Sequence, residues 1–377
     1  MNEDKIYRLF SPCIPVRGAR RSLIADLNRH QSFYIPNDLV KVLDYGYNRL
    51  WKDVVCHFGE ENREAIESYC DYLYRNELIF ELDHNECSLF PKFPLDWDFP
   101  SQCSNAIVDW DNESRYDMAD TLQMLSNINC HHLQIRFFKS IGMEKVRELL
   151  TLCESLNFST IQLAFSFSAN EEKEYGQLFE NCWKLAKMEV FSAPYDKIVP
   201  KMGNICLLLF YKSKNLELQN CGCVSKQYFV TETNHFTEAQ HHNTCLNRKI
   251  CIDANGDIKN CPAMKKSYGN IRDTTLKEAI EKPGFKDCWT ICKDQIDVCK
   301  DCEFRYMCTD CRAFIKDPEN PYSQPAKCTY NPYICLWEGQ DGYVPIKECG
   351  TYSRETGFVP DKDKIAELNK RIWGEEE

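Results

Sequence analysis

Seven cysteines in the last third of the chain lie at short intervals that suit a metal site. They are Cys245, Cys261, Cys299, Cys302, Cys308, Cys311 and Cys328. Thiolate sulfur is a soft ligand that favours zinc or iron–sulfur clusters. A core does not need so many thiols in so short a stretch, so their spacing predicts a metal-binding domain.

A tight turn is predicted to bring the first two of these cysteines together. Asn255 and Gly256 form a strong hairpin signal after a short strand around 250–252. A hairpin at this position returns Cys261 toward Cys245.

The later cysteines include two Cys-x-x-Cys pairs, Cys299/Cys302 and Cys308/Cys311, which are typical metal-ligand knuckles. Five residues separate the two pairs. Zinc ribbons usually separate theirs by roughly 15–20 residues. The spacing therefore favours iron–sulfur clusters and leaves zinc as the alternative.

The composition predicts a globular protein in a reducing compartment. The chain has 377 residues, a net charge of −11 and 23 cysteines. No signal segment is visible at its start, and its longest apolar run, 205–210, is far too short to cross a bilayer. We therefore expect a cytoplasmic protein without a disulfide framework. The acidic charge argues against nucleic acid and anionic membranes as partners.

Residues 1–90 predict a small α+β unit. Strand character appears at 6–10, 22–27 and 32–35, and 79–82 returns as a strand. A helix capped by Asn37 or Asp38 is expected after the third strand, and a second helix over about 60–77. The proline-rich residues 88–103 predict a linker.

Residues 104–230 predict a strand–helix repeat. Strands are expected at 106–108, 133–137, 160–165, 189–191 and 205–211, with helices at 116–129, 143–156 and 171–186. Such a repeat is typical of a parallel sheet with right-handed crossovers. About five units cannot close an eight-stranded barrel. The fold class is therefore α/β, with an open sheet or a partial (β/α) barrel.

The rest of the chain divides into the cysteine-rich residues 231–349 and a tail, 350–377. Within 231–349 we expect one helix near 276–280. From about residue 362 the tail predicts an exposed terminal helix.

The cysteine-rich domain resembles, over roughly 245–328, the SPASM domain of peptide-modifying radical SAM enzymes. Besides the cysteine spacing, YGNI at 268–271 followed by TLKEA at 275–279 is similar to the stretch between the two halves of that domain. The resemblance implies two auxiliary [4Fe–4S] clusters. By position, one cluster would be held by Cys299, Cys302, Cys308 and Cys328, and the other in part by Cys245, Cys261 and Cys311.

Two features depart from the SPASM pattern. Only Thr309 and Asp310 separate Cys308 from Cys311, where the family usually has three residues. Seven thiols also leave one cluster a ligand short of four. Our candidate for the eighth ligand is Cys221, followed by Cys223 and Cys251, although Cys251 is better interpreted as a packed strand residue.

The three cysteines that bind the SAM cluster of radical SAM enzymes, spaced C-x3-C-x2-C, are absent. The expected place after the first barrel strand contains Asp109, Asp111 and Glu113 but no cysteine. Cys288 and Cys292 have the first spacing, but position 295 is glutamine. We therefore expect no SAM chemistry and a degenerate barrel. The three acidic residues suggest either a repurposed pocket or an ordinary polar loop, and the loop is favoured.

Nearly the whole chain resembles the SPASM-domain peptide maturases of grasp-with-spasm systems. The similar stretches are 9–22, 235–250 and 302–312. This resemblance implies ribosomal-peptide maturation with a precursor peptide and an ATP-grasp ligase as partners. Residues 1–90 resemble winged-helix leader-recognition elements, which bind a peptide as an added strand at a sheet edge.

The reaction itself does not follow from the sequence, which names no catalytic residue and leaves open whether the protein is an enzyme. One alternative is a SAM-independent iron–sulfur redox enzyme acting on a peptide. Another is a zinc-organised protein-interaction module. The chain has neither a GxxxxGK nor a GxGxxG motif, so nucleotide binding has no support.

Overall fold

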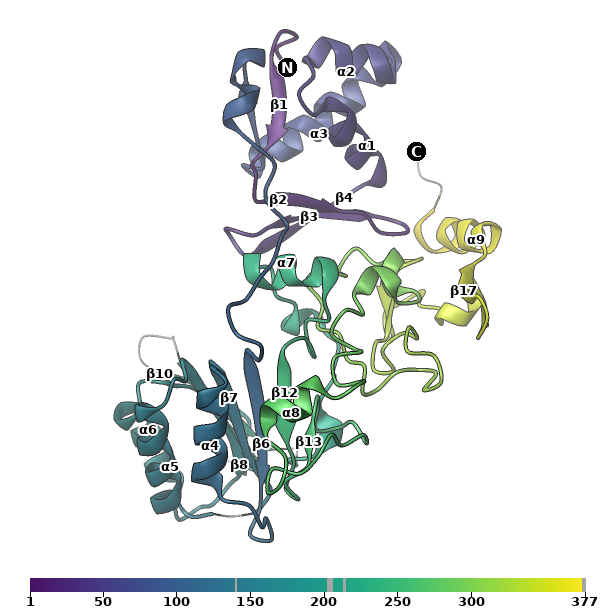
Figure 1. Cartoon of the computed structure of the whole chain (residues 1–377). Helices are drawn as coiled ribbons and strands as arrows, with labels where there is room; N and C mark the ends of the chain where they lie inside the picture. The colour runs from purple at the N-terminus through teal and green to yellow at the C-terminus, as the bar shows by residue number, and fades with distance from the viewer. Residues whose placement is uncertain (140, 202–205, 213–214, 375–377) are drawn as a thin grey trace.

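A mixed eight-stranded sheet forms the largest element of the molecule (Figure 1). The computed structural model of the chain describes residues 1–139, 141–201, 206–212 and 215–374. The strand order is β10-β11-β9-β8-β7-β6-β12-β13, and only the two end pairs, β10–β11 and β12–β13, are antiparallel. The strands are β6 (Asn105–Trp110), β7 (His132–Phe137), β8 (Thr160–Ser166), β9 (Leu185–Phe191), β10 (Lys197–Lys201), β11 (Cys206–Tyr211), β12 (Lys249–Ile252) and β13 (Ile258–Lys259).

Helices follow the first three strands of this sheet and cover one of its faces (Figure 1). They are α4 (Met118–Asn127), α5 (Met143–Ser155) and α6 (Glu172–Asn181), and their apolar sides share one core with the strands. The predicted α/β repeat is thereby confirmed as a mostly parallel sheet, which is consistent with a partial barrel. Residue 205 of the expected last strand lies outside the described residues.

Strand β10 was not expected, because Pro200 lies inside it. Proline cannot donate to a strand ladder and is tolerated on edge strands. β10 is such an edge strand, and within the described ranges it pairs with β11 alone.

The predicted hairpin is present and extends the sheet into the cysteine-rich segment. Gly256 has a φ of +86°, which suits the turn between β12 and β13. β12 lies parallel to β6, with Ile250 opposite Ala106. Side chains from 250–289 join the same hydrophobic core as the barrel strands. The first half of the cysteine-rich segment is therefore built onto the sheet.

The N-terminal unit is α+β, as predicted, with more elements than the sequence indicated. It contains β1 (Ile6–Leu9), β2 (Cys13–Val16), β3 (Ser22–Asp26), β4 (Gln31–Ile35), α1 (Asn37–Gly46), α2 (Trp51–Phe58), α3 (Arg63–Arg75) and β5 (Ile79–Leu82). β2, β3 and β4 form an antiparallel sheet, and β1 pairs with β5. β2 and α2 were not predicted, since each is short.

The expected side-chain cap of α1 is wrong. The residue before the helix is Pro36, and no side chain caps the first turn. Asn37 instead accepts a hydrogen bond from Ser22 Oγ at 2.5 Å and donates to the Gly18 carbonyl at 3.2 Å. Its amide therefore ties the start of the helix to β3 and to the loop before it.

The N-terminal sheet packs against the cysteine-rich segment. Leu23 and Ala25 of β3 share a core with Phe236, Phe304 and further apolar residues. Beside this core, Arg21 Nε lies 2.8 Å from Glu303 Oε1, and Glu303 is fully buried. The knuckle that carries Cys302 is thereby held against the N-terminal unit.

The remaining elements are short. They are α7 (Thr233–His241), α8 (Leu276–Glu281), β14 (Tyr330–Asn331), β15 (Leu336–Trp337), β16 (Gly350–Ser353), β17 (Gly357–Pro360) and α9 (Lys362–Trp373). α8 matches the helix expected near 276–280 and begins with a capping box between Thr275 and Glu278. The predicted exposed terminal helix is α9, which has no buried residue. Among the described residues, no helix combines the length and apolar character that a bilayer crossing requires.

Helix α7 provides a test of how burial sets stability near the first predicted ligand. Burial raises the pKa of Glu238 to about 7, and Asn247 Nδ2 donates to its carboxylate at 2.9 Å. The pKa of Glu238 is higher in the folded protein than in the unfolded chain. The stability that Glu238 contributes is therefore fully present at a pH below its unfolded-state pKa, and it is lost as the pH rises through about 7.

We therefore expect Glu238→Gln to raise the free energy of unfolding by on the order of 1–3 kcal/mol at about pH 8, and to have little effect at about pH 4. Denaturant unfolding across this range measures it. Glu232→Gln, an exposed position just before α7, serves as the control. An identical pH dependence in wild type and Glu238→Gln would contradict the expectation.

Candidate metal centre

Four of the predicted ligands line one small cavity and are called here the first cysteine group. They are Cys299, Cys302, Cys308 and Cys328. The cavity has a volume of about 20 Å³, and the aromatic side chains of Phe229, Phe304 and Trp337 form part of its wall. Such walls exclude water, which strengthens any charge interaction inside.

The other four predicted ligands gather around Lys249 on β12 and form the second cysteine group. They are Cys221, Cys245, Cys261 and Cys311. Lys249 Nζ lies 3.6 Å from Cys245 Sγ, and it lies close enough to Cys261 and Cys221 for an electrostatic interaction with their thiolate forms. Cys311 in turn lies within electrostatic range of Cys245 and Cys221. Cys221, our candidate eighth ligand, therefore lies with the group that was a ligand short; its ligation of metal remains a prediction.

The short spacer between Cys308 and Cys311 connects the two groups. Asp310 is 1% exposed, and its carboxylate lies 2.8 Å from Arg312 Nη2 and 3.6 Å from Lys293 Nζ. Asn243 Nδ2 also donates to it at 2.9 Å. Because this carboxylate is held from three sides, the two-residue spacer can direct Cys308 into one group and Cys311 into the other.

Each cysteine group has its own lysine. Lys293, which is 4% exposed, has its Nζ 3.8 Å from Cys308 Sγ and 4.0 Å from Cys299 Sγ. Burial opposes the charge of Lys293, but the Asp310 carboxylate, together with the thiolate forms of Cys299 and Cys308, outweighs burial and raises the pKa of Lys293. Lys249 behaves in the same way in the second group. Two ammonium groups are therefore placed where thiolates would need positive charge.

Burial favours the protonated form of three of these thiols in the absence of metal. It raises the pKa of Cys299 to about 12 and that of Cys308 to about 11, although Lys293 opposes both shifts. In the second group burial raises the pKa of Cys261 to about 12. Since metals bind thiolates, metal entry must release these protons.

The donor chemistry of both groups fits an iron–sulfur cluster or zinc, since each set has four cysteines. Over the described part of the chain, however, no three His, Cys, Asp or Glu side chains lie close enough together to hold a metal ion. The first cavity has room for about one water molecule. A four-iron cluster there requires the thiols to move apart.

The runner-up ligand positions differ in their surroundings. Cys223 is exposed. Cys251 is fully buried within β12, as expected for a packed strand residue. Gly222, between Cys221 and Cys223, has a φ of +77°, and a Cβ built on it would lie 2.7 Å from Cys311 Sγ. The backbone at this glycine therefore lies directly against the second cysteine group.

The three acidic residues at the end of β6 have two kinds of surroundings. Asp109 lies inside the strand, where its buried carboxylate receives two hydrogen bonds from Arg136 of β7, at 2.6 and 2.7 Å. Asp111 accepts a hydrogen bond from the Glu113 amide, and Glu113 pairs with Lys139. Asp111 and Glu113 therefore agree with the favoured interpretation of a polar loop, whereas for Asp109 that interpretation is wrong, because its carboxylate forms a buried ion pair within the sheet.

A polar cavity of about 150 Å³ opens at the carboxyl ends of β7, β8, β9 and β11. Arg136, Glu189 and Tyr211 contribute to its wall, and Tyr211 Oη donates to Glu189 Oε1 at 3.2 Å. Cys221 lines the same cavity. The mouth of the partial barrel and the second cysteine group therefore meet at one residue.

Sequence reasoning missed Lys249, Lys293 and the role of Asp310. In a sequence, a lysine four residues after Cys245, or next to Cys292, looks like any surface lysine. One feature of the sequence could have drawn attention to Asp310: it lies in the spacer between Cys308 and Cys311, which is shorter than in the SPASM pattern.

Comparisons with known proteins found only distant similarity, at 10–12% sequence identity. Neither a family profile nor a curated protein matches it. Among solved structures it is similar to Streptococcus suis SuiB bound to S-adenosylmethionine, with 10% identity and a TM-score of 0.39 over 85% of this chain and 99% of that chain. SuiB bound to its precursor peptide SuiA gives 12% identity and a TM-score of 0.34 over 86% and 98% of the two chains. A likeness this distant assigns no activity to the chain.

Gly222 gives a test of the second cysteine group. We expect Gly222→Ala to lower bound metal by about half, because the added methyl group displaces Cys311 and a side chain at this φ is strained. Metal analysis of the purified full-length variant measures the effect.

Gly339→Ala is the matched control, since Gly339 has a similar φ of +88° and no atom lies within 4 Å of its added Cβ. Wild-type metal content in Gly222→Ala would show that Cys311 does not bind metal.

Proposed function

We propose that this protein is a ribosomal-peptide maturation protein that holds two iron–sulfur clusters and binds a precursor peptide. The observation that carries the proposal is the sorting of eight cysteines into two groups of four, each with a lysine beside it. Such clusters, when bound, supply one-electron transfer. The chain's own residues hold the clusters, balance their charge and exclude water.

The peptide's leader segment would bind at the free edge of β4. In the part of the chain that the structure describes, β4 pairs with β3 alone. The Tyr34 carbonyl accepts a hydrogen bond from Tyr72 of α3, so the backbone of Tyr34 faces away from β3. Because strand orientation repeats every two residues, the amide of exposed Ser32 also faces this edge. An added peptide strand would therefore find a backbone donor there.

The core segment of the peptide would occupy the polar cavity at the barrel mouth. This cavity borders the second cysteine group through Cys221 and offers Arg136, Glu189 and Tyr211 to a peptide backbone. The first cysteine group lies close to the N-terminal unit, since Phe304 joins the core of that interface and also lines the first cavity. A peptide bound to β4 thus starts near one group and would be directed toward the other.

Two finer parts of the proposal rest on sequence resemblance. The partner ligase, of the ATP-grasp class, follows from the similarity to grasp-with-spasm maturases. The chemistry excludes SAM cleavage, because the three upstream cysteines of that motif are absent from the sequence. The clusters would organise the peptide-binding surface or exchange electrons with the peptide.

A second candidate is a zinc-organised interaction protein. The observation that favours it is the small cavity of the first cysteine group, whose volume of about 20 Å³ suits a single ion better than a four-iron cube. In that case the edge of β4 would still bind the peptide, but the metal would transfer no electrons.

Metal analysis after anaerobic purification separates the two candidates. We expect about eight iron and eight sulfide per chain, falling by about half in Cys308→Ala. Cys223→Ala, an exposed cysteine outside both groups, should keep the wild-type content. One or two zinc ions with no sulfide would refute the iron–sulfur proposal and support the zinc-organised protein.

Peptide binding at β4 is tested by a substitution that removes one backbone donor. Extended peptides selected from a display library against the full-length protein should bind Ser32→Pro about tenfold more weakly, equivalent to about 1.4 kcal/mol. Ser32→Ala keeps the amide and should bind as wild type does. Equal affinity for the Pro and Ala variants would exclude strand addition at this edge.

A further inference from the structure

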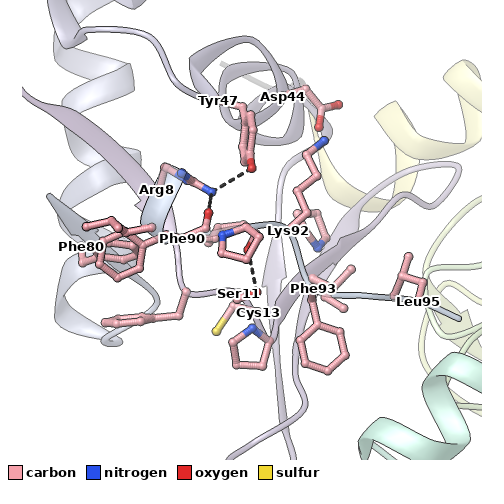
Figure 2. A pocket seen from close by; sticks show the side chains of 17 residues that line it. Arg8, Ser11, Cys13, Asp44, Tyr47, Phe80, Phe90, Lys92, Phe93 and Leu95 are labelled. Carbon is pink, nitrogen blue, oxygen red and sulfur yellow. Dashed lines mark hydrogen bonds between the residues drawn. The ribbon is translucent and has the colours of Figure 1, made fainter. Parts of the chain in front are cut away.

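The N-terminal unit contains a second, larger cavity that shares no residue with either cysteine group. Its volume is about 510 Å³, within the range of roughly 300–1,000 Å³ that is usual for ligand sites. Figure 2 shows its walls, which come from β1, β2, β5, α1 and the chain at 89–95.

The segment that closes one side of this cavity is held in place. Arg8 Nη1 donates to the Cys87 carbonyl at 3.1 Å, and its Nη2 donates to the Phe90 carbonyl. Ser11 Oγ donates to the Pro91 carbonyl at 3.1 Å. The cavity is therefore a built feature of the fold rather than a gap beneath a loose linker.

The walls are mainly apolar, include five aromatic side chains, and extend onto the surface. Phe80 lies against both Phe10 and Phe90, with ring centroids 4.9 Å apart in each pair (Figure 2). Phe10 and Phe90 are each 42% exposed, and Leu89 is 71% exposed. Clustered exposed apolar side chains of this kind mark interaction sites.

The charge of the cavity is positive within a protein of net charge −11. Arg8 is 5% exposed, and among the described residues its guanidinium donates hydrogen bonds to four uncharged oxygens. Lys92 lies over the ring of Tyr47 at 4.5 Å, and among the described residues neither it nor Arg8 forms an ion pair. Asp44, the one acidic lining residue, is paired with Arg17 at 2.5 Å.

A buried guanidinium without a counter-ion is costly, so an anion in the cavity would be favoured. The terminal nitrogens of Arg8 are already bonded, and its contribution is therefore long-range attraction. Lys92, which is exposed and flexible, is the group able to contact an anion directly.

We propose that this cavity binds an acidic peptide segment in which a large aromatic side chain precedes a carboxylate. The aromatic ring fills the space beside Phe80, and the carboxylate pairs with Lys92. A peptide fits better than a small metabolite because the exposed Phe10, Leu89 and Phe90 continue the apolar surface beyond the cavity. Since Pro12, Pro15 and Pro91 in its wall have no amide to donate, recognition uses side chains rather than strand addition.

The test compares two blocked peptides, acetyl-Gly-Phe-Glu-Gly-amide and its Gln counterpart, by calorimetric titration of the full-length protein. Wild type should bind the Glu peptide about tenfold more tightly, because a charge-assisted hydrogen bond replaces a neutral one. Lys92→Gln should remove this preference. Lys41→Gln, an exposed lysine of α1 outside the cavity, should keep it.

Equal binding of the two peptides by wild type, or an unchanged preference in Lys92→Gln, would overturn the proposal. So would undiminished binding of a peptide with Ala in place of Phe, since the aromatic wall would then have no role. Ser32→Pro separates this site from the edge of β4. Ser32→Pro should leave the affinity for the Glu peptide unchanged. If Ser32→Pro lost binding while Lys92→Gln did not, the peptide would bind at β4 and the proposal would be overturned.

Discussion

The buried carboxylate of Asp310 is the interaction on which the arrangement of the two cysteine groups depends. It lies between Cys308 and Cys311, which belong to different groups, and it is held by Lys293, Arg312 and Asn243. Removing one partner of such a buried network leaves uncompensated charge and typically costs about 3–5 kcal/mol. The network therefore holds the two-residue spacer in place, with Cys308 and Cys311 in different cysteine groups.

Charge balance extends from this network to the thiols. Around the first group, Lys293 and Arg312 together carry one more positive charge than Asp310 neutralises, and Lys249 adds another beside the second group. Without metal, the thiols of Cys299, Cys308 and Cys261 remain protonated, because burial raises the pKa of each. Under the proposed function, the lysines would balance the charge of metal-bound thiolates, which need positive charge in a water-poor setting.

The surrounding fold holds the groups between two larger bodies. β12 joins the second group to the barrel sheet, because Lys249 is the first residue of a strand that pairs with β6. On the other side, the Arg21–Glu303 ion pair and the core around Phe304 join the first group to the N-terminal sheet. Under the proposed function, the order of these parts would give a bound peptide a path from β4, past the first group, to the cavity at Cys221. The cavity beside Lys92 shares no lining residue with the cavity at Cys221 or with that of the first group.

The sequence alone determined those features that are local in the chain. The Asn255-Gly256 turn, the strand–helix repeat and the knuckle spacing were all predictable, because a turn, a helix or a Cys-x-x-Cys pair depends on neighbours a few residues away. The α1 cap was predicted wrongly, since Asn37 bonds to Ser22 fifteen residues earlier. Only the tertiary structure decided that Cys221 lies with Cys311, that Lys249 and Lys293 face thiols, and that the buried Arg8 bonds to uncharged oxygens. Each of these depends on contacts between residues distant in sequence, and no local pattern distinguishes a lysine that will be buried beside thiols from one that will remain in water.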